Sequence, residues 1–181
     1  MILGDDKIHE LMECGYLQTD CEKRINPASL NVRIGNSFLV PCRKLFGGIR
    51  LGSRVKYRSV RIKEGEVFRL RPGQFALATT MEHICVPNDL AAFVQGRSSI
   101  GRAGLTVQNA GFIDPGFSGH ITLELKNETT NTILIPPGYP VAQIVFEEAT
   151  QVMNPYRGKY SGQIDATGSR MYLDDEGIKN G

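Results

Sequence analysis

The sequence predicts an all-β fold with one short N-terminal helix. Several short apolar segments lie along the 181-residue chain, and clusters of Gly, Pro, Asn and Asp separate them. Within several segments apolar and polar residues alternate, which is the period of a strand with one buried face. Many short strands at this spacing are typical of a sandwich, a jelly roll or a distorted barrel.

The predicted helix comprises residues 5–15. Ile8, Leu11 and Met12 recur at helical spacing, so they are expected to face the core. One of the two aspartates at the start of the segment is expected to cap the helix, and Gly15 is expected to end it.

Seven later segments have the pattern of strands. In the first, Leu30, Val32 and Ile34 alternate with the polar Asn31 and Arg33. Turn signals such as Arg-Pro-Gly and Pro-Pro-Gly separate the segments. The other predicted strands are residues 67–70, 75–80, 90–95, 121–125, 132–135 and 141–146.

Two regions have no clear period. Residues 45–60 contain Gly and Arg and predict a loop or an irregular hairpin. Residues 153–181 are rich in Gly, Tyr, Arg, Lys and Asp, and such a tail is either a frayed terminus or a lid that orders over a ligand. Because a chain of this length fits one core, we expect a single domain over residues 1–181, with 153–181 as its C-terminal lid or tail.

Charge and hydropathy indicate a cytoplasmic protein that binds neither nucleic acid nor membrane. The formal net charge is +2 and the pI is about 8.4, which is a weak bias for a nucleic-acid partner but permits a local basic pocket for a small anion. The N-terminus has no signal-peptide core, and no segment approaches the ~18 apolar residues of a membrane helix.

Neither the cysteines nor the histidines are spaced as metal ligands. Cys14, Cys21, Cys42 and Cys85 contain no C-x-x-C pair, so they are expected to be reduced thiols that pack as small hydrophobic residues. The three histidines have no partner at ligand spacing and are expected to be structural or exposed. The H-x-E and P-C-x-x-C signature of zinc deaminases is absent. We therefore expect no protein-bound metal.

The segment around Arg97 has the composition of an anion site. Ser98 and Ser99 lie between Arg97 and Arg102, after a predicted strand that runs into Gly96. Backbone N–H groups at the start of a helical turn, together with two guanidinium groups, can hold phosphate oxygens. The alternative is a polar turn with a serine cap, and the pattern alone does not decide between them.

Two further segments have candidate functional residues. Near Ala110 and Gly111 the backbone could approach a planar ligand, because glycine has no side chain in the way. Asp114 could accept a hydrogen bond from a sugar hydroxyl and Phe117 could stack beneath the sugar ring, although Asp-Pro-Gly is also a common turn. Glu124 lies between leucines in a predicted strand and shares a face with Thr122. A carboxylate in this position is either exposed to solvent or a buried acid whose raised pKa suits proton transfer.

Five blocks of the sequence, taken together, resemble the dCTP deaminases and their relatives, the trimeric dUTPases. The blocks stand in the same order and span nearly the whole chain. They are NPASLNVRIGNSF, GRSSIGR, AGFIDPGFSGHITLELKN, PPGYPVAQIVF and YRGKYSGQIDATGSR.

The resemblance implies a dUTPase-like distorted barrel or jelly roll, a homotrimer, and active sites at the interfaces between subunits. Glu124 matches the catalytic glutamate, and Asp114 matches the residue that binds the 3′-hydroxyl. Phe117 and Tyr156 would pack on the nucleotide, and Gln143 matches a glutamine of the PG-x-x-x-x-Q block. The residues that would hold the triphosphate are Arg97, Ser98, Ser99, Arg102, Lys159 and Gln163.

The reaction that the resemblance implies is zinc-independent deamination of dCTP. Glu124 would take a proton from a water above carbon 4 of cytosine and pass protons to the ring nitrogen and the leaving ammonia. Backbone groups from Val107 through Gln108 to Ala110 would hold the edge of the pyrimidine. Mg²⁺ would arrive with the triphosphate, bound through phosphate oxygens and water, and dTTP is a candidate feedback inhibitor.

The chain resembles the family members that also cut the α–β phosphate bond and release dUMP. Deaminase-only members often have His-Arg where this chain has Gly111 and Phe112, and the small glycine leaves room for a second water that Asp114 could orient. The chain departs from the family at Asn31, where an acid usually helps to hold the water shell of Mg²⁺. The alternatives are a deaminase that stops at dUTP, a plain dUTPase, and a nucleotide-sensing module without turnover.

Overall fold

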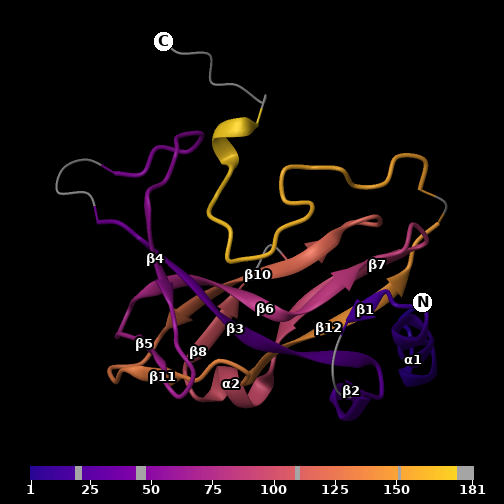
Figure 1. The fold of residues 1–181 in the computed structure, drawn as a ribbon, viewed down its shortest axis with the longest axis horizontal. Coiled ribbons are helices and arrows are strands. Elements are labelled where there is room, and N and C mark those ends of the chain that lie inside the picture. Colours follow the sequence, from indigo (N-terminus) through magenta and orange to yellow (C-terminus); the bar gives the residue numbers. More distant parts are fainter. Residues whose placement is uncertain (19–21, 44–47, 109–110, 151, 175–181) are drawn as a thin grey trace.

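The computed structural model describes residues 1–18, 22–43, 48–108, 111–150 and 152–174, and these confirm the all-β prediction (Figure 1). In this part of the chain, ten strands form one curled antiparallel sheet. Its main path runs in the order β8 (Leu105–Gln108), β10 (Ser118–Asn127), β6 (Phe75–Cys85), β3 (Ser29–Pro41), β12 (Pro140–Glu148), β7 (Leu90–Gly96) and β9 (Phe112–Ile113).

Shorter strands extend this path. Strand β1 (Leu17–Gln18) pairs with β6, while β2 (Ile25–Asn26) and β4 (Tyr57–Arg61) pair with β3. A separate two-stranded sheet consists of β5 (Phe68–Leu70) and β11 (Ile133–Ile135). All seven predicted strands are therefore present. Strands β3 and β6 continue seven and five residues beyond their predicted ends, and the other ends shift by at most three residues.

The sheet curls because β3 belongs to both of its halves. The first half of β3 pairs with β12, and the second half pairs with β6 and β4. The register of β3 against β6 shifts between Ile34 and Phe38, and such an irregularity bends a strand. One long strand thus connects the half that contains β12 and β7 to the half that contains β6 and β10.

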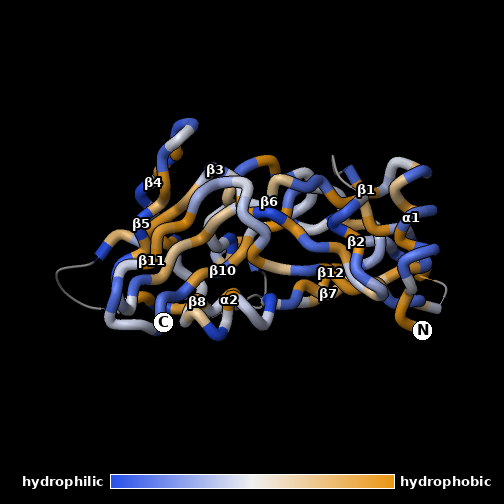
Figure 2. The backbone as a smooth tube through the Cα atoms, turned by 90° about the horizontal axis from the view of Figure 1, so that it is seen from below, coloured by the Kyte–Doolittle hydropathy of each residue, from blue (hydrophilic) through white to orange (hydrophobic). Residues whose placement is uncertain are grey.

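The core follows the alternation that the sequence shows. Leu30, Val32 and Ile34 are fully buried. Along β10 every second residue from Gly119 to Asn127 is buried, and the residues between them are half-buried. Figure 2 shows hydrophobic and hydrophilic residues interleaved along the strands. Because full burial of a Leu or Ile side chain contributes about 1.5–3 kcal/mol, these buried rows stabilise the sheet.

The helix α1 (Asp5–Glu13) is present, but the predicted aspartate cap is wrong. The N-cap is Gly4, and both aspartates lie in the first turn, where negative charge favours the helix dipole. Ile8 is fully buried, and Leu11 and Met12 pack against the core as predicted. Gly15 follows the helix with a positive φ of 78°, which explains why the helix ends there.

The prediction that the thiols pack as small hydrophobic residues is wrong for two cysteines. Cys14 and Cys42 are exposed, and both lie where an element ends: Cys14 is the C-cap of α1, and Cys42 follows the last residue of β3. Cys85 is half-buried, and these three thiols are free. Cys21 lies outside the described residues. Within the described ranges, no helix has both the length and the apolar character to cross a membrane.

Candidate active site

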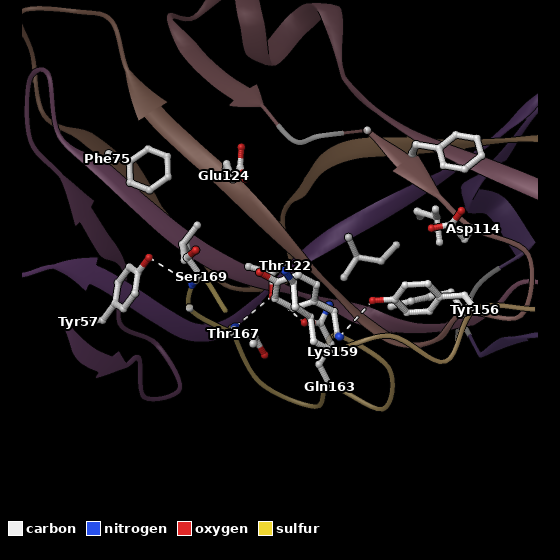
Figure 3. A pocket seen from close by; sticks show the side chains of 18 residues that line it. Tyr57, Phe75, Asp114, Thr122, Glu124, Tyr156, Lys159, Gln163, Thr167 and Ser169 are labelled. Carbon is white, nitrogen blue, oxygen red and sulfur yellow. Dashed lines mark hydrogen bonds between the residues drawn. The ribbon is translucent and has the colours of Figure 1, made fainter. Parts of the chain in front are cut away.

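A cavity of about 620 Å³ lies between the C-terminal segment (residues 152–174) and one face of the sheet (Figure 3). Strands β4, β6, β9 and β10 supply one side of it, and the C-terminal segment supplies the other. The residues that line the cavity are Tyr57, Phe75, Leu77, Gly111, Phe112, Ile113, Asp114, Phe117, Ile121, Thr122, Glu124, Tyr156, Lys159, Tyr160, Gln163, Thr167, Gly168 and Ser169.

Glu124 lies in this cavity and not on the solvent-exposed surface. Its strand, β10, runs between β6 and β8, and Glu124 is opposite Leu77 on one side and Gln108 on the other. The alternation of β10 buries Leu123 and Leu125 on the opposite face and turns Glu124 toward the cavity. Burial raises the pKa of the Glu124 carboxyl above its ordinary value of 4.5, because a low-dielectric surrounding disfavours the charged form.

The raised pKa of Glu124 has a consequence for stability. The folded protein binds this proton more tightly than the unfolded chain, so the free energy of unfolding falls as the pH rises above 4.5 toward the folded pKa. We expect Glu124→Gln to be more stable than the wild type at about pH 8 and equally stable at about pH 4. Urea denaturation at both pH values measures this. A variant that is less stable at about pH 8 would show that the folded protein favours the charged carboxylate.

Asp114, Phe117 and Tyr156 lie together at the other end of the cavity (Figure 3). Asp114 follows β9, and its carbonyl oxygen accepts a hydrogen bond from the N–H of Phe117 (3.1 Å), so the predicted turn is present. The ring centroids of Phe117 and Tyr156 are 6.1 Å apart, at 45°. The N–H of Tyr156 donates to the carbonyl oxygen of Pro115 (2.8 Å), which attaches the C-terminal segment to this turn.

The middle of the C-terminal segment is hydrogen-bonded to β10. The N–H of Gly162 donates to the carbonyl oxygen of Ser118 (2.8 Å), and the N–H of His120 donates to that of Gln163 (2.9 Å). The Thr122 hydroxyl lies 3.4 Å from Oε1 of Gln163. Lys159, also in the cavity, forms an ion pair with Asp174. These contacts bring Lys159 and Gln163 to the same cavity as Glu124.

The candidate phosphate residues are not part of this cavity. Ser98 and Ser99 begin the short helix α2 (Ser98–Arg102), which follows β7 and packs beside β8. The Arg97 guanidinium donates to the carbonyl oxygen of Pro140 (2.9 Å). The helical turn expected after Gly96 is therefore present. Within one chain, however, the arginine–serine segment (residues 97–102) is separate from the cavity that contains Lys159 and Gln163.

Four other predicted residues lie apart from the cavity or cannot be placed in it. Gln143, on β12, accepts a hydrogen bond from the hydroxyl of Ser29 (3.1 Å). Val107, on β8, is half-buried and is not among the lining residues. Gln108 is described here only by its backbone pairing with Glu124, and Ala110 lies outside the described residues.

Sequence reasoning missed several residues that line the cavity. Thr122 could have been included, because it shares a strand face with Glu124. Tyr57 and Ser169 had no such signal, since they come from an unpatterned region and from the C-terminal segment. They meet through a hydrogen bond from the Ser169 N–H to the Tyr57 hydroxyl (3.3 Å).

The histidines do not form a metal centre in the part of the chain that the structure covers. His83 and His120 are in contact, with ring centroids 5.5 Å apart, and desolvation by burial lowers the pKa of His83. Across the described ranges, no group of three or more His, Cys, Asp or Glu side chains is arranged to hold a metal ion.

The chain is similar to proteins of known name over nearly its whole length. The model of the dCTP deaminase-like family matches residues 2–149. The dCTP deaminase, dUMP-forming, of Persephonella marina is 42% identical over 97% of this chain and 100% of its own length. The protein of the same name from a Sulfurihydrogenibium species is 43% identical over 96% of this chain and 99% of its own length.

A solved structure has a similar fold. The 2′-deoxycytidine 5′-triphosphate deaminase of Agrobacterium tumefaciens is 23% identical and superposes with a TM-score of 0.65. The match covers 82% of this chain and 48% of that chain. From the family match and the identity to full-length relatives, we conclude that the chain belongs to the dCTP deaminase-like family.

Proposed function

We propose that the protein deaminates dCTP by hydrolysis, without zinc, and also hydrolyses the α–β phosphate bond, so that the product is dUMP. The observation that carries this proposal is Glu124, a carboxyl group with a raised pKa inside a cavity large enough for a nucleotide. The relatives named dUMP-forming dCTP deaminases, at 42% and 43% identity, support the same reaction.

In the proposed deamination, Glu124 is the general base and then the general acid. It takes a proton from water as the water oxygen adds to carbon 4 of cytosine, and it passes this proton to the ring nitrogen. It then takes the proton of the new hydroxyl on carbon 4 and passes it to the exocyclic nitrogen. The bond from carbon 4 to the exocyclic nitrogen then breaks, and ammonia leaves. A carboxyl group whose pKa is raised above its ordinary value is a better proton acceptor and so suits both directions of transfer. Backbone groups of residues 107–110 would hold the pyrimidine edge and the developing charge.

The second hydrolysis would occur at the Asp114 end of the cavity. Gly111 has a positive φ of 60° and lines the cavity, so no side chain occupies the space beside Asp114 at this position. A water held by Asp114 would attack the α-phosphate, and pyrophosphate would leave. A deaminase that stops at dUTP needs no such water.

The triphosphate would bridge two copies of the chain. Lys159 and Gln163 line the cavity. Arg97, directly before α2, and Arg102, at the end of α2, lie outside the cavity. A homotrimer in which α2 of one subunit faces the cavity of its neighbour would complete the ring of phosphate donors. Without a neighbour, the site has only two of its six predicted triphosphate ligands.

The chain fits a Mg²⁺ ion that is bound through phosphate and water. Four neutral polar side chains are hydrogen-bonded in a row, from Asn31 to Asn26, from Asn26 to Ser29 and from Ser29 to Gln143, at 3.0–3.1 Å. Amide and hydroxyl groups can hold the waters of a hydrated Mg²⁺, which keeps several of them in proteins. The ion would neutralise charge on the phosphate oxygens. Because position 31 is a neutral Asn and not an acidic residue, we expect the protein without nucleotide to bind Mg²⁺ weakly.

Residues 153–181 would serve as the lid of this site. A prediction follows from Gly116, whose φ is +87° and whose added Cβ would lie 2.6 Å from Pro155. We expect Gly116→Ala to displace the C-terminal segment and lower kcat/KM for dCTP by roughly 10²-fold, because misplacement by about 1 Å has that effect. Gly65→Ala is the matched control: Gly65 also has a positive φ (+78°) but has nothing within 4 Å of an added Cβ. Equal losses of activity in the two variants would contradict a lid.

Product analysis tests the proposed function. The protein is incubated with dCTP, dUTP or dCMP and Mg²⁺, and ammonia and pyrophosphate are assayed separately. We expect dCTP to give ammonia, pyrophosphate and dUMP in equal amounts, and dCMP to give no ammonia. Accumulation of dUTP from dCTP would show that the protein does not hydrolyse the α–β phosphate bond. Turnover of dUTP but not of dCTP would show that the protein is a plain dUTPase.

A further inference from the structure

We propose that the cavity also accepts a small alkyl group on the exocyclic nitrogen of cytosine, so that the enzyme releases alkylamines from N4-alkyl-dCTP. This inference rests on the proposed function and extends its substrate class. It arises from the part of the cavity that continues beyond Glu124, away from Asp114. We call this part the distal pocket and define it by Tyr57, Phe75, Leu77, Gly168 and Ser169.

The distal pocket extends past the proposed catalytic carboxyl. Leu77 is opposite Glu124 in the pairing of β6 with β10, and Phe75 is opposite Lys126, two residues further along. Two residues of strand correspond to about 7 Å. Figure 3 shows Phe75 and Tyr57 on the Glu124 side of the cavity and Asp114 and Tyr156 at the opposite end. A nucleoside that extends from Asp114 to Glu124 therefore leaves this space unfilled.

The walls of the distal pocket suit a neutral, apolar group. Leu77 is 6% exposed and Phe75 is 37% exposed, so Phe75 presents part of its ring to the open space. The Tyr57 hydroxyl is engaged by the N–H of Ser169 (3.3 Å). Gly168 lies against the Tyr57 ring, where an added Cβ would be 2.6 Å from a ring carbon. Apart from the tyrosine, none of the five residues is ionisable, so a charged substituent would find no partner.

The shape of cytosine directs such a group into the distal pocket. Carbon 4 is opposite the ring nitrogen that bears the sugar, so a substituent on the exocyclic nitrogen points away from the sugar. With the sugar at Asp114 and carbon 4 at Glu124, that direction leads toward Phe75 and Tyr57. A substituent on carbon 5 would diverge from this line toward the side of the ring.

The reaction with N4-methyl-dCTP is balanced in the same way as the reaction with dCTP. Water adds to carbon 4 while Glu124 transfers one of its protons to the ring nitrogen. Glu124 then transfers the second proton, from the new hydroxyl on carbon 4, to the exocyclic nitrogen, and the bond between carbon 4 and that nitrogen breaks. Methylamine leaves in place of ammonia, and carbon 4 becomes a carbonyl. No oxidant, reductant or further reactant is needed.

Turnover of N4-methyl-dCTP and N4-propyl-dCTP, with dCTP in parallel, tests the proposal. We expect methylamine from N4-methyl-dCTP with kcat/KM within about tenfold of that for dCTP, because one methyl group in an apolar pocket changes binding only modestly. Failure to release methylamine while dCTP is turned over would overturn this inference and leave the proposed function intact. Failure with both substrates would overturn the proposed function as well.

A filling variant assigns the effect to the distal pocket. Ser169→Leu places a larger side chain there, and we expect it to lower the ratio of kcat/KM for N4-propyl-dCTP to that for dCTP by about tenfold or more. Ser161→Leu is the matched control, because Ser161 is exposed in the same segment and does not line the cavity. It should leave the ratio within about twofold. If the ratio of kcat/KM for N4-propyl-dCTP to that for dCTP is the same in both variants, the alkyl group does not bind in the distal pocket and the proposal is overturned.

Discussion

Replacing Glu124 by Gln is expected to lower kcat for ammonia release from dCTP by roughly 10²–10⁴-fold, which is the contribution of a placed general acid–base. Glutamine has nearly the same shape but cannot take the proton of the attacking water. The substitution removes no contact with the triphosphate, so the Kd for dCTP should change little. Steady-state ammonia release and equilibrium binding of dCTP measure the two quantities.

Glu128→Gln is the control for this variant. Glu128 follows β10, is exposed and forms a surface ion pair with Lys126 (3.0 Å), so its loss should leave kcat unchanged. Deamination by Glu124→Gln at the wild-type rate would show that Glu124 does not transfer protons in the reaction. A large loss of dCTP affinity would instead indicate that Glu124 holds the substrate and does not transfer protons.

Mixing two impaired variants is expected to restore activity, because the triphosphate ligands and the carboxyl would come from different subunits. Arg102→Ala alone should lower kcat/KM by about 10–100-fold, the usual effect of losing a hydrogen bond to a charged group. Arg102 is exposed on α2, outside the cavity that contains Glu124. Co-expressed with Glu124→Gln, it should yield about one intact site in four on random assembly into trimers.

The control for this experiment is a mixture of Glu124→Gln with the double variant that has both substitutions. No site in that mixture contains an intact Glu124, so no activity should return. Activity of the first mixture equal to the mean of its two components would show that each site is formed within one subunit. Size-exclusion chromatography with light scattering checks that the mixtures assemble.

The sequence was sufficient for the parts of the fold that have a strong period. Leu30, Val32 and Ile34 alternate in sequence and are fully buried, because one face of β3 meets the core. Strand β4 lies partly in a region that predicted a loop or an irregular hairpin. It pairs with β3, and its Tyr57 hydroxyl accepts a hydrogen bond from Ser169, more than a hundred residues later in the chain. Contacts at that separation leave no local pattern.

At the site, too, the local sequence pattern predicted the direction of the Glu124 side chain but not its surroundings. Alternation correctly predicted that Glu124 and Thr122 share a face, but it could not say what covers that face. The C-terminal segment covers it, and its attachment depends on backbone hydrogen bonds such as the one between Gly162 and Ser118 (2.8 Å). Backbone groups are common to all residues, so composition does not reveal such pairing. The predicted cap of α1 failed by a small margin, since the N-cap Gly4 lies one position before Asp5 and two before Asp6.

A crystal structure of Glu124→Gln with dCTP and Mg²⁺ shows directly whether position 124 lies at the reacting carbon of cytosine. We expect the side chain at position 124 to lie within about 3 Å of the exocyclic nitrogen or carbon 4 of cytosine, or to reach it through one water. We also expect the 3′-hydroxyl at Asp114 and the triphosphate at Arg97 and Arg102 of a neighbouring subunit. A cytosine ring bound elsewhere, with position 124 remote from carbon 4, would contradict the proposed mechanism.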